Sequence, residues 1–122
     1  MKSVTPLEEY VDLPELLDRV EKDEDLLREL FALFQEDLPA SRAALQTAAD
    51  SGDLGEIERT AHRLKGMLAN LSAKRTASLA AEIESAARAG NAQKIPELAS
   101  TFDSQISAFS AALDSFTASA RE

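Results

Sequence analysis

The chain has 122 residues, which is long enough for one domain with a single modest hydrophobic core. Its formal net charge of −9 argues against nucleic acid and anionic membranes as partners, because both are bound by neutralising phosphate groups with Lys and Arg. The absence of cysteine excludes disulfides, thiolate zinc sites and a cysteine nucleophile, and the single histidine excludes a multi-histidine metal site.

Residue usage favours helices and a soluble setting. Ala, Leu, Glu and Ser dominate while Val, Tyr and Trp are scarce or absent, which predicts an all-α fold. No apolar run approaches the roughly 18 residues that a membrane span requires. Acidic residues Glu8, Glu9 and Asp12 stand where a signal peptide would be apolar, so we expect a cytoplasmic protein.

The first third of the chain predicts an extension and two helices. Residues 1–11 have no clear period and are expected to form an N-terminal extension. Asp12-Leu13-Pro14 is typical of a helix start and predicts a short helix over about 12–20, because Pro is favoured in the first turn. A long amphipathic helix is expected over about 23–50, with a stripe of Leu27, Phe31, Phe34, Leu38, Leu45 and Ala48.

Pro39 lies inside this long helix and predicts a kink or local break. An interior proline removes one backbone hydrogen bond and costs about 3 kcal/mol. Ser51-Gly52 then predicts the end of the helix, because glycine readily adopts the left-handed conformation.

Three capping patterns divide the rest of the chain. Asp53 followed by Glu56 resembles a capping box and starts a third helix, and Ser72 is expected to cap a fourth that ends at Gly90-Asn91. A last helix is predicted over about 92–118. The predicted core stripes of these three helices are Leu54, Ile57, Ala61, Leu64, Leu68 and Leu71; then Leu79, Ala80, Ile83, Ala86 and Ala87; then Ile95, Leu98, Phe102, Ile106, Phe109, Leu113 and Phe116.

These elements predict an antiparallel four-helix bundle with a short extra N-terminal helix. We assign residues 12–118 to the bundle and 119–122 to a C-terminal tail, and we expect a monomer.

The only histidine, His62, is predicted to point away from the core. At about 100° per residue it lies nearly opposite the stripe that contains Ile57 and Leu64. A lone histidine is most often a core residue or a surface bystander, so its surroundings decide the interpretation. Its expected surface neighbours are Gly55, Glu58, Arg59, Lys65, Gly66 and Ala69.

Gly66 and Lys65 favour a functional role for this histidine. Glycine inside a helix costs about 1 kcal/mol relative to Ala, and a side chain at position 66 would lie back over His62. Gly66 therefore leaves the imidazole open to another protein, and Gly55 and Ala69 keep the same face low. Lys65 leans the same way as His62, so its ammonium can stabilise negative charge added to the ring.

The charge pattern and the missing motifs favour group transfer. Basic residues without any acidic ones among them form an island around the histidine that could steer an acidic partner pocket. A neutral imidazole is a nucleophile at physiological pH. No nucleophile elbow and no phosphate-binding glycine loop occur, so hydrolysis is not indicated. The island consists of Arg59, Arg63, Lys65, Lys74 and Arg75.

The segment Ala61-His62-Arg63-Leu64-Lys65-Gly66-Met67-Leu68-Ala69-Asn70-Leu71-Ser72-Ala73 resembles the histidine-containing phosphotransfer (HPt) pattern A-H-x-L-K-G-x-x-x-N-L-G-A. The resemblance extends over nearly residues 12–116. It departs from the pattern at Ser72, where the family usually has glycine, and Met67 is bulkier than is common there.

The resemblance implies a phosphorelay protein that takes a phosphoryl group from a receiver-domain aspartyl phosphate on His62 and passes it to a receiver. It implies that Lys65 favours the phosphoryl group and that Gly66 admits the receiver. The protein would be a stoichiometric carrier rather than an enzyme, either freestanding or excised from a hybrid histidine kinase. Mg²⁺ would belong to the receiver, so no metal or cofactor is expected on this chain. The expected partner surface is Gly55, Glu58, Arg59, Arg63, Ala69, Glu84 and Arg88.

Three alternatives remain at this point. A helical interaction module could bind or sequester a receiver without being phosphorylated, although His62 with Lys65 and Gly66 argues against it. An oligomeric coiled-coil scaffold on the 95–116 stripe fits poorly with the helix breaks. A dimerising kinase phosphoacceptor domain would normally carry an acidic residue directly after the histidine, where Arg63 stands here.

Overall fold

The computed structural model describes residues 6–120 of the chain, and the side chains of residues 7–117. This part of the chain is all-helical and has no strand, which confirms the predicted class. Its elements are the short 3-10 helices η1 (Pro6–Glu9) and η2 (Ala92–Lys94) and the α-helices α1 (Leu13–Arg19), α2 (Glu24–Ser51), α3 (Leu54–Asn70), α4 (Lys74–Arg88) and α5 (Ile95–Ala120).

Aspartate side chains start the first three α-helices. Asp12, Asp23 and Asp53 each accept a hydrogen bond from the backbone N–H three residues later, at 3.1 to 3.2 Å. Each carboxylate thereby satisfies a donor that has no partner inside the helix, and its charge complements the helix dipole. The starts predicted at Asp12 and Asp53 are thus present.

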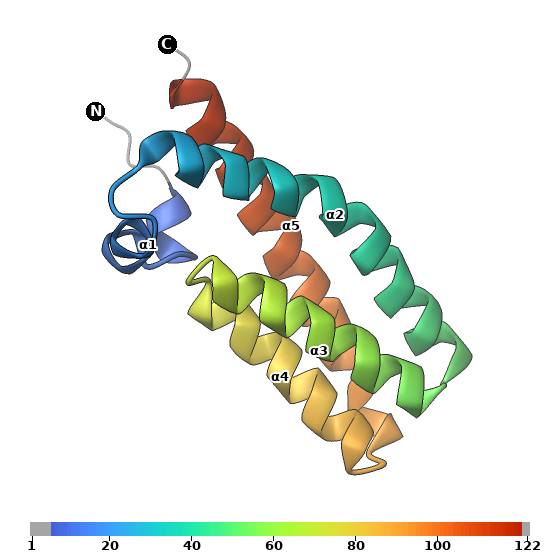
Figure 1. Ribbon diagram of the computed structural model, residues 1–122. Coiled ribbons are helices and arrows are strands. Elements are labelled where there is room, and N and C mark those ends of the chain that lie inside the picture. Colours follow the sequence, from blue (N-terminus) through green and yellow to red (C-terminus); the bar gives the residue numbers. More distant parts are fainter. Residues whose placement is uncertain (1–5, 121–122) are drawn as a thin grey trace.

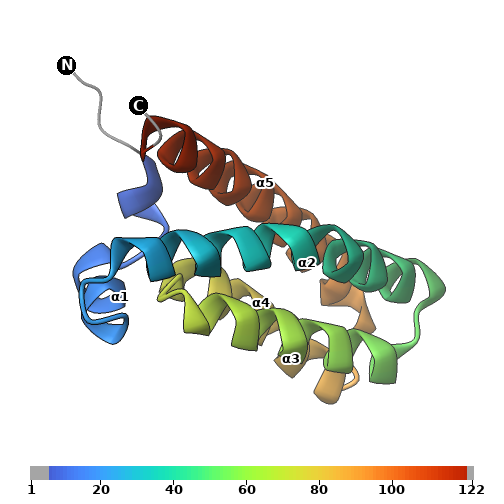
Figure 2. The same ribbon diagram turned by 45° about the horizontal axis from the view of Figure 1, so that its top comes forward.

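The four long helices pack around one hydrophobic core. Helix α3 packs against α2 and α4, and α5 packs against α4 and α2, so the four form a closed ring of contacts. Figures 1 and 2 show the chain turning back on itself after α2, after α3 and after α4. The predicted stripes are buried except for four half-buried members, Leu54, Leu79, Leu98 and Phe116.

The packed core starts before the expected boundary at residue 12. Leu7 and Val11 are 0% and 3% exposed, and the ring of Tyr10 lies 5.9 Å from that of Phe109 on α5. A single 3-10 turn is too short to produce a recognisable stripe, which is why the sequence pattern did not reveal it. Residues 1–5 and 121–122 of the expected extension and tail lie outside the described residues.

The break predicted at Pro39 is not present. Helix α2 is a single helix that runs through this position. Pro39 is on the exposed face, so its ring lies away from the packed core.

The predicted capping role of Ser72 is wrong. The residue before α4 is Ala73, which makes no side-chain cap, and the Ser72 hydroxyl is buried. Ser72 instead ends α3 with a left-handed backbone, φ 56°. The N–H of Ser72 donates to the carbonyl of Ala69 at 3.0 Å, and the N–H of Ala73 donates to the carbonyl of Leu68 at 2.9 Å. This pair of hydrogen bonds is the Schellman pattern.

Candidate functional site

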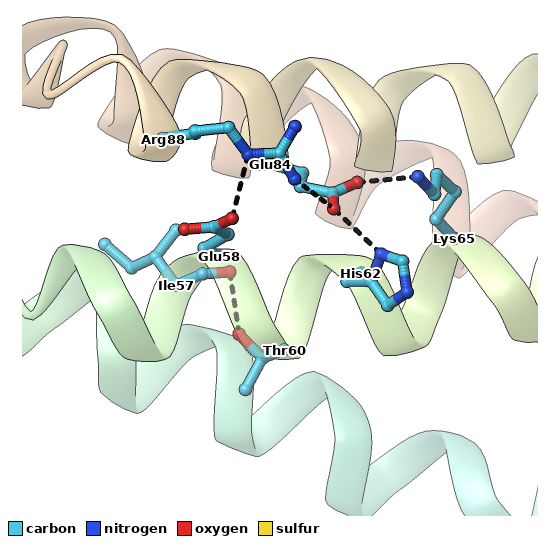
Figure 3. A network of polar contacts seen from close by, with 7 residues as sticks. All are labelled: Ile57, Glu58, Thr60, His62, Lys65, Glu84 and Arg88. Carbon is cyan, nitrogen blue, oxygen red and sulfur yellow. Dashed lines mark hydrogen bonds and ion pairs between the residues drawn. The ribbon is translucent and has the colours of Figure 1, made fainter.

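His62 lies in the middle of α3 on the face turned away from the core. Its side chain is 66% exposed, whereas Ala61 and Leu64 on either side are fully buried. This is the orientation that the helical period predicts. In Figure 3 the imidazole stands at the surface between α3 and α4, with one ring nitrogen turned toward α4 and the other turned away from it.

Glu84 on α4 contacts both α3 side chains that were predicted to take part in the chemistry, His62 and Lys65. One carboxylate oxygen, Oε2, lies 2.8 Å from Nδ1 of His62, and the other, Oε1, lies 2.8 Å from Nζ of Lys65. Figure 3 shows the three side chains converging between the two helices. Glu84 itself is only 5% exposed, so it is a buried anchor for two side chains that reach solvent.

Arg88 extends this network along the seam between α3 and α4. Its Nη2 donates to Oε2 of Glu84 at 3.0 Å and its Nε donates to Oε2 of Glu58 at 2.9 Å. The guanidinium therefore bridges a carboxylate on each helix (Figure 3). Glu84 receives three partners in all, which satisfies a buried carboxylate that would otherwise be costly.

The network keeps Glu84 ionised and thereby fixes the proton on His62. The hydrogen bond from Lys65, followed by that from His62, holds the pKa of Glu84 below its usual value, and burial opposes this only in part. An ionised carboxylate can only accept hydrogen bonds, so Nδ1 of His62 must be the donor. In the neutral ring the lone pair is then on Nε2, the nitrogen that is free to react.

Gly66 has open space where a side chain would begin. A Cβ atom built on it would have no neighbour within 4 Å, so close packing against another helix does not explain the glycine. Gly55 differs, because a Cβ there would lie 3.5 Å from Oδ1 of Asp53. Gly55 is therefore next to the helix cap, whereas Gly66 and the exposed Ala69 leave the surface around His62 low.

The basic island expected around the histidine is largely neutralised. Arg59 binds Glu56, Lys65 binds Glu84, and Lys74 lies 3.1 Å from Glu15. The sequence showed no acidic residue among these cations, but carboxylates from the preceding turn and from other helices reach them. Of the predicted set, Arg63 and Arg75 are exposed and make no ion pair within the described residues.

The predicted site residues therefore fall into three groups. His62, Lys65, Glu84, Arg88 and Glu58 form one connected network. Gly66, Ala69 and Arg63 lie on the exposed surface of α3 beside it, and Gly55 and Arg59 lie one to two turns before it, near the start of α3.

The central place of Glu84 was not foreseen from the sequence, which placed it only in the expected partner surface. One signal was available: Glu84 directly follows Ile83 and is flanked by the buried Ala80 and Ala87 of the same stripe. A charged residue beside an apolar stripe requires a partner, and His62 and Lys65 supply it.

Two kinds of feature are absent from the part of the chain that the structure describes. Within the described residues no cluster of three or more His, Cys, Asp or Glu side chains could hold a metal ion. Over the same part of the chain, no helix combines the length and the apolar character needed to cross a membrane.

Comparison with known proteins identifies the family. The family model for the Hpt domain matches residues 29–112, a range that includes His62, Lys65, Gly66, Glu84 and Arg88. Neither the curated proteins nor the solved structures contain a match. Hpt domains are phosphocarriers of two-component signalling rather than enzymes, and they act with receiver domains or histidine kinases. Since the match covers well over half of its length, the chain belongs to the Hpt domain family.

Proposed function

We propose that this protein is a histidine phosphotransfer protein of a phosphorelay. Nε2 of His62 accepts the phosphoryl group from the aspartyl phosphate of a receiver domain, and the group then moves to a receiver domain. The observation that carries this proposal is the exposed imidazole with its Nδ1 bound to the buried Glu84, which leaves Nε2 facing solvent.

The surrounding residues fit roles in the same reaction. The ammonium of Lys65 binds the same Glu84 carboxylate that anchors His62. It is therefore within reach of a phosphoryl group on the His62 ring and would stabilise the negative charge of that group. Gly66 would give the receiver clearance to bring its aspartate close, because nothing occupies the space above it. Arg63 is the exposed cation best placed to meet an acidic receiver pocket, since no intramolecular carboxylate holds it within the described residues.

The finer architecture supports this use. We propose an antiparallel four-helix bundle over residues 12–118 with a short extra N-terminal helix, followed by a short tail and preceded by an N-terminal extension whose Leu7 and Val11 also pack into the core. In such a bundle α3 and α4 turn their core faces inward and present the polar seam between them to the outside. The protein would act as a cytoplasmic monomer, and the magnesium ion that phosphoryl transfer uses would be held by the receiver.

The alternative of an interaction module that is never phosphorylated is less well supported. Such a module would have no need for an ionised carboxylate fixed on Nδ1, nor for an exposed lone pair on the opposite nitrogen. The network around Glu84 has both features, and they support a nucleophilic imidazole.

Phosphorylation by a receiver tests the proposal. The full chain would be mixed with a receiver domain carrying a labelled aspartyl phosphate, and acid-labile label on the chain would be measured with the wild type and with His62→Gln. We expect label on the wild type and none on the variant, because His62 is the only histidine. Binding of the receiver without any transfer of label would favour the interaction module instead.

A further inference from the structure

The bond to Glu84 occupies the ring nitrogen opposite the one that would carry the phosphoryl group. Nδ1 of His62 lies 2.8 Å from a carboxylate oxygen that is almost fully buried, whereas the ring itself is largely exposed. A reaction at Nε2 thus leaves this hydrogen bond in place (Figure 3).

We propose that Glu84 keeps the proton on Nδ1 while Nε2 carries the phosphoryl group, so that His62 leaves as a neutral imidazole when the group moves on. This inference rests on the proposed function. It makes Glu84 a positioning residue that sets how readily the phosphoryl group is released.

The chemistry of the two transfer steps gives the reason. In the first step the Nε2 lone pair attacks phosphorus, the N–P bond forms, and the bond from phosphorus to the aspartyl oxygen breaks with its electron pair going to that oxygen. The ring then carries a proton on Nδ1 and phosphorus on Nε2, and is a cation. In the second step a receiver carboxylate attacks phosphorus, and the N–P electron pair returns to Nε2.

The leaving group in the second step depends on the Nδ1 proton. If the proton is still there, the departing ring is a neutral imidazole. If it has been lost, the departing ring is an imidazolate anion, a far stronger base and a poor leaving group. A negative charge in hydrogen-bonding contact with Nδ1 favours the cationic ring and therefore the faster release.

The charges around Glu84 leave its effect on the ring intact. From α3 it faces Lys65 and, through Arg88, Glu58; from its own helix it faces Arg88. Lys65 and Arg88 carry two positive charges, and Glu58 and Glu84 itself carry two negative charges. The seam between α3 and α4 is therefore neutral before the His62 ring is counted. Within the described residues Arg63, next to His62, makes no ion pair, and the ion pairs of Glu84 involve only side chains of α3 and α4.

Direct observation of the ring proton tests this inference. The full chain, labelled with ¹⁵N in histidine, would be phosphorylated with phosphoramidate, and the ¹⁵N shift of Nδ1 would be followed from acidic to basic pH. Wild type would be compared with Glu84→Gln, which keeps the shape but removes the charge. Glu82→Gln, an exposed position on the same helix, is the matched control.

We expect the phosphorylated ring of Glu84→Gln to lose its proton at a pH about one unit or more below that of the wild type. The ring of Glu82→Gln should titrate as in the wild type. Transfer to a receiver above that pH should slow by up to about tenfold in Glu84→Gln alone. Equal ring titration in all three proteins would overturn the inference and leave the proposed function intact. Failure of the wild type to form phosphohistidine with either phosphoramidate or a receiver would overturn both.

If Glu84→Gln folds poorly, the same titration of the phosphorylated wild type, with and without denaturing urea, replaces the variant. The phosphorylated wild type in denaturing urea has lost its contact with Glu84, so its ring should lose the proton at a lower pH than the ring of the folded chain. The same titration in urea and in buffer would contradict the role of Glu84 without recourse to any variant.

Discussion

The two faces of helix α3 differ in what they contribute. The inner face, with Ile57, Leu64 and Leu68 at 0 to 1% exposure, holds the helices together. The outer face, with His62, Gly66 and Ala69, is exposed and makes few contacts. One helix thus separates stability from chemistry, and substitutions on the two faces should have opposite consequences. Glu84, on the neighbouring helix α4, combines both roles, because it is buried and also bonds the histidine.

The largest expected effect is on the inner face. Leu64→Ala removes a fully buried side chain and should lower the free energy of unfolding by about 2–5 kcal/mol, because a cavity remains. Chemical denaturation measures this. The phosphotransfer rate per folded molecule should stay at the wild-type level, and a specific loss of transfer in the folded fraction would break the separation of the two faces.

A bulky residue at the outer face should do the reverse. Gly66→Leu fills the open space beside His62 and should weaken receiver-dependent phosphorylation by about ten- to hundredfold, since overpacking a contact costs about 1–3 kcal/mol. The free energy of unfolding should rise by up to about 1 kcal/mol, because leucine favours the helix more than glycine does. Normal transfer by this variant would show that Gly66 gives no clearance.

Glu84 should make stability depend on pH in the acid range. Its pKa is lowered in the folded protein, chiefly by Lys65, so its contribution is present above the usual value of 4.5 and is lost as pH falls through the lower folded value. Glu84→Gln should remove about 1 kcal/mol at neutral pH and less in acid. Denaturation curves of both proteins at several pH values measure the difference, which should shrink as pH falls. A difference that stays constant would mean that the charge of Glu84 does not contribute.

The smallest effect is expected at the end of α3. Ser72 adopts a left-handed backbone at φ 56°, which costs about 1 kcal/mol for a residue with a Cβ atom. Ser72→Gly should therefore raise the thermal unfolding midpoint, and transfer through His62 should not change. Ser78→Gly, at an exposed position inside α4, is a control of opposite sign, because glycine destabilises a helix interior. A lower midpoint for Ser72→Gly would contradict this account of the turn.

Much of the fold could be predicted because the apolar stripes repeat with the helical period. The same period placed His62 opposite Leu64, and the structure has it there. The role of Ser72 could not be predicted, since a serine before a helix is a cap in one backbone conformation and a helix end in another. The pairing of Lys65 with Glu84 was also out of reach, because a helical period states which face a side chain is on but not which neighbour it meets across helices.

The most direct test of the account is to identify the ring nitrogen that carries the phosphoryl group. The chain with ¹⁵N-labelled His62 would be phosphorylated by a receiver, and ³¹P–¹⁵N coupling would show which nitrogen is bonded to phosphorus. Because Glu84 occupies Nδ1, we expect coupling to Nε2 and a proton on Nδ1. Coupling to Nδ1, or no phosphohistidine at all, would contradict the central claim.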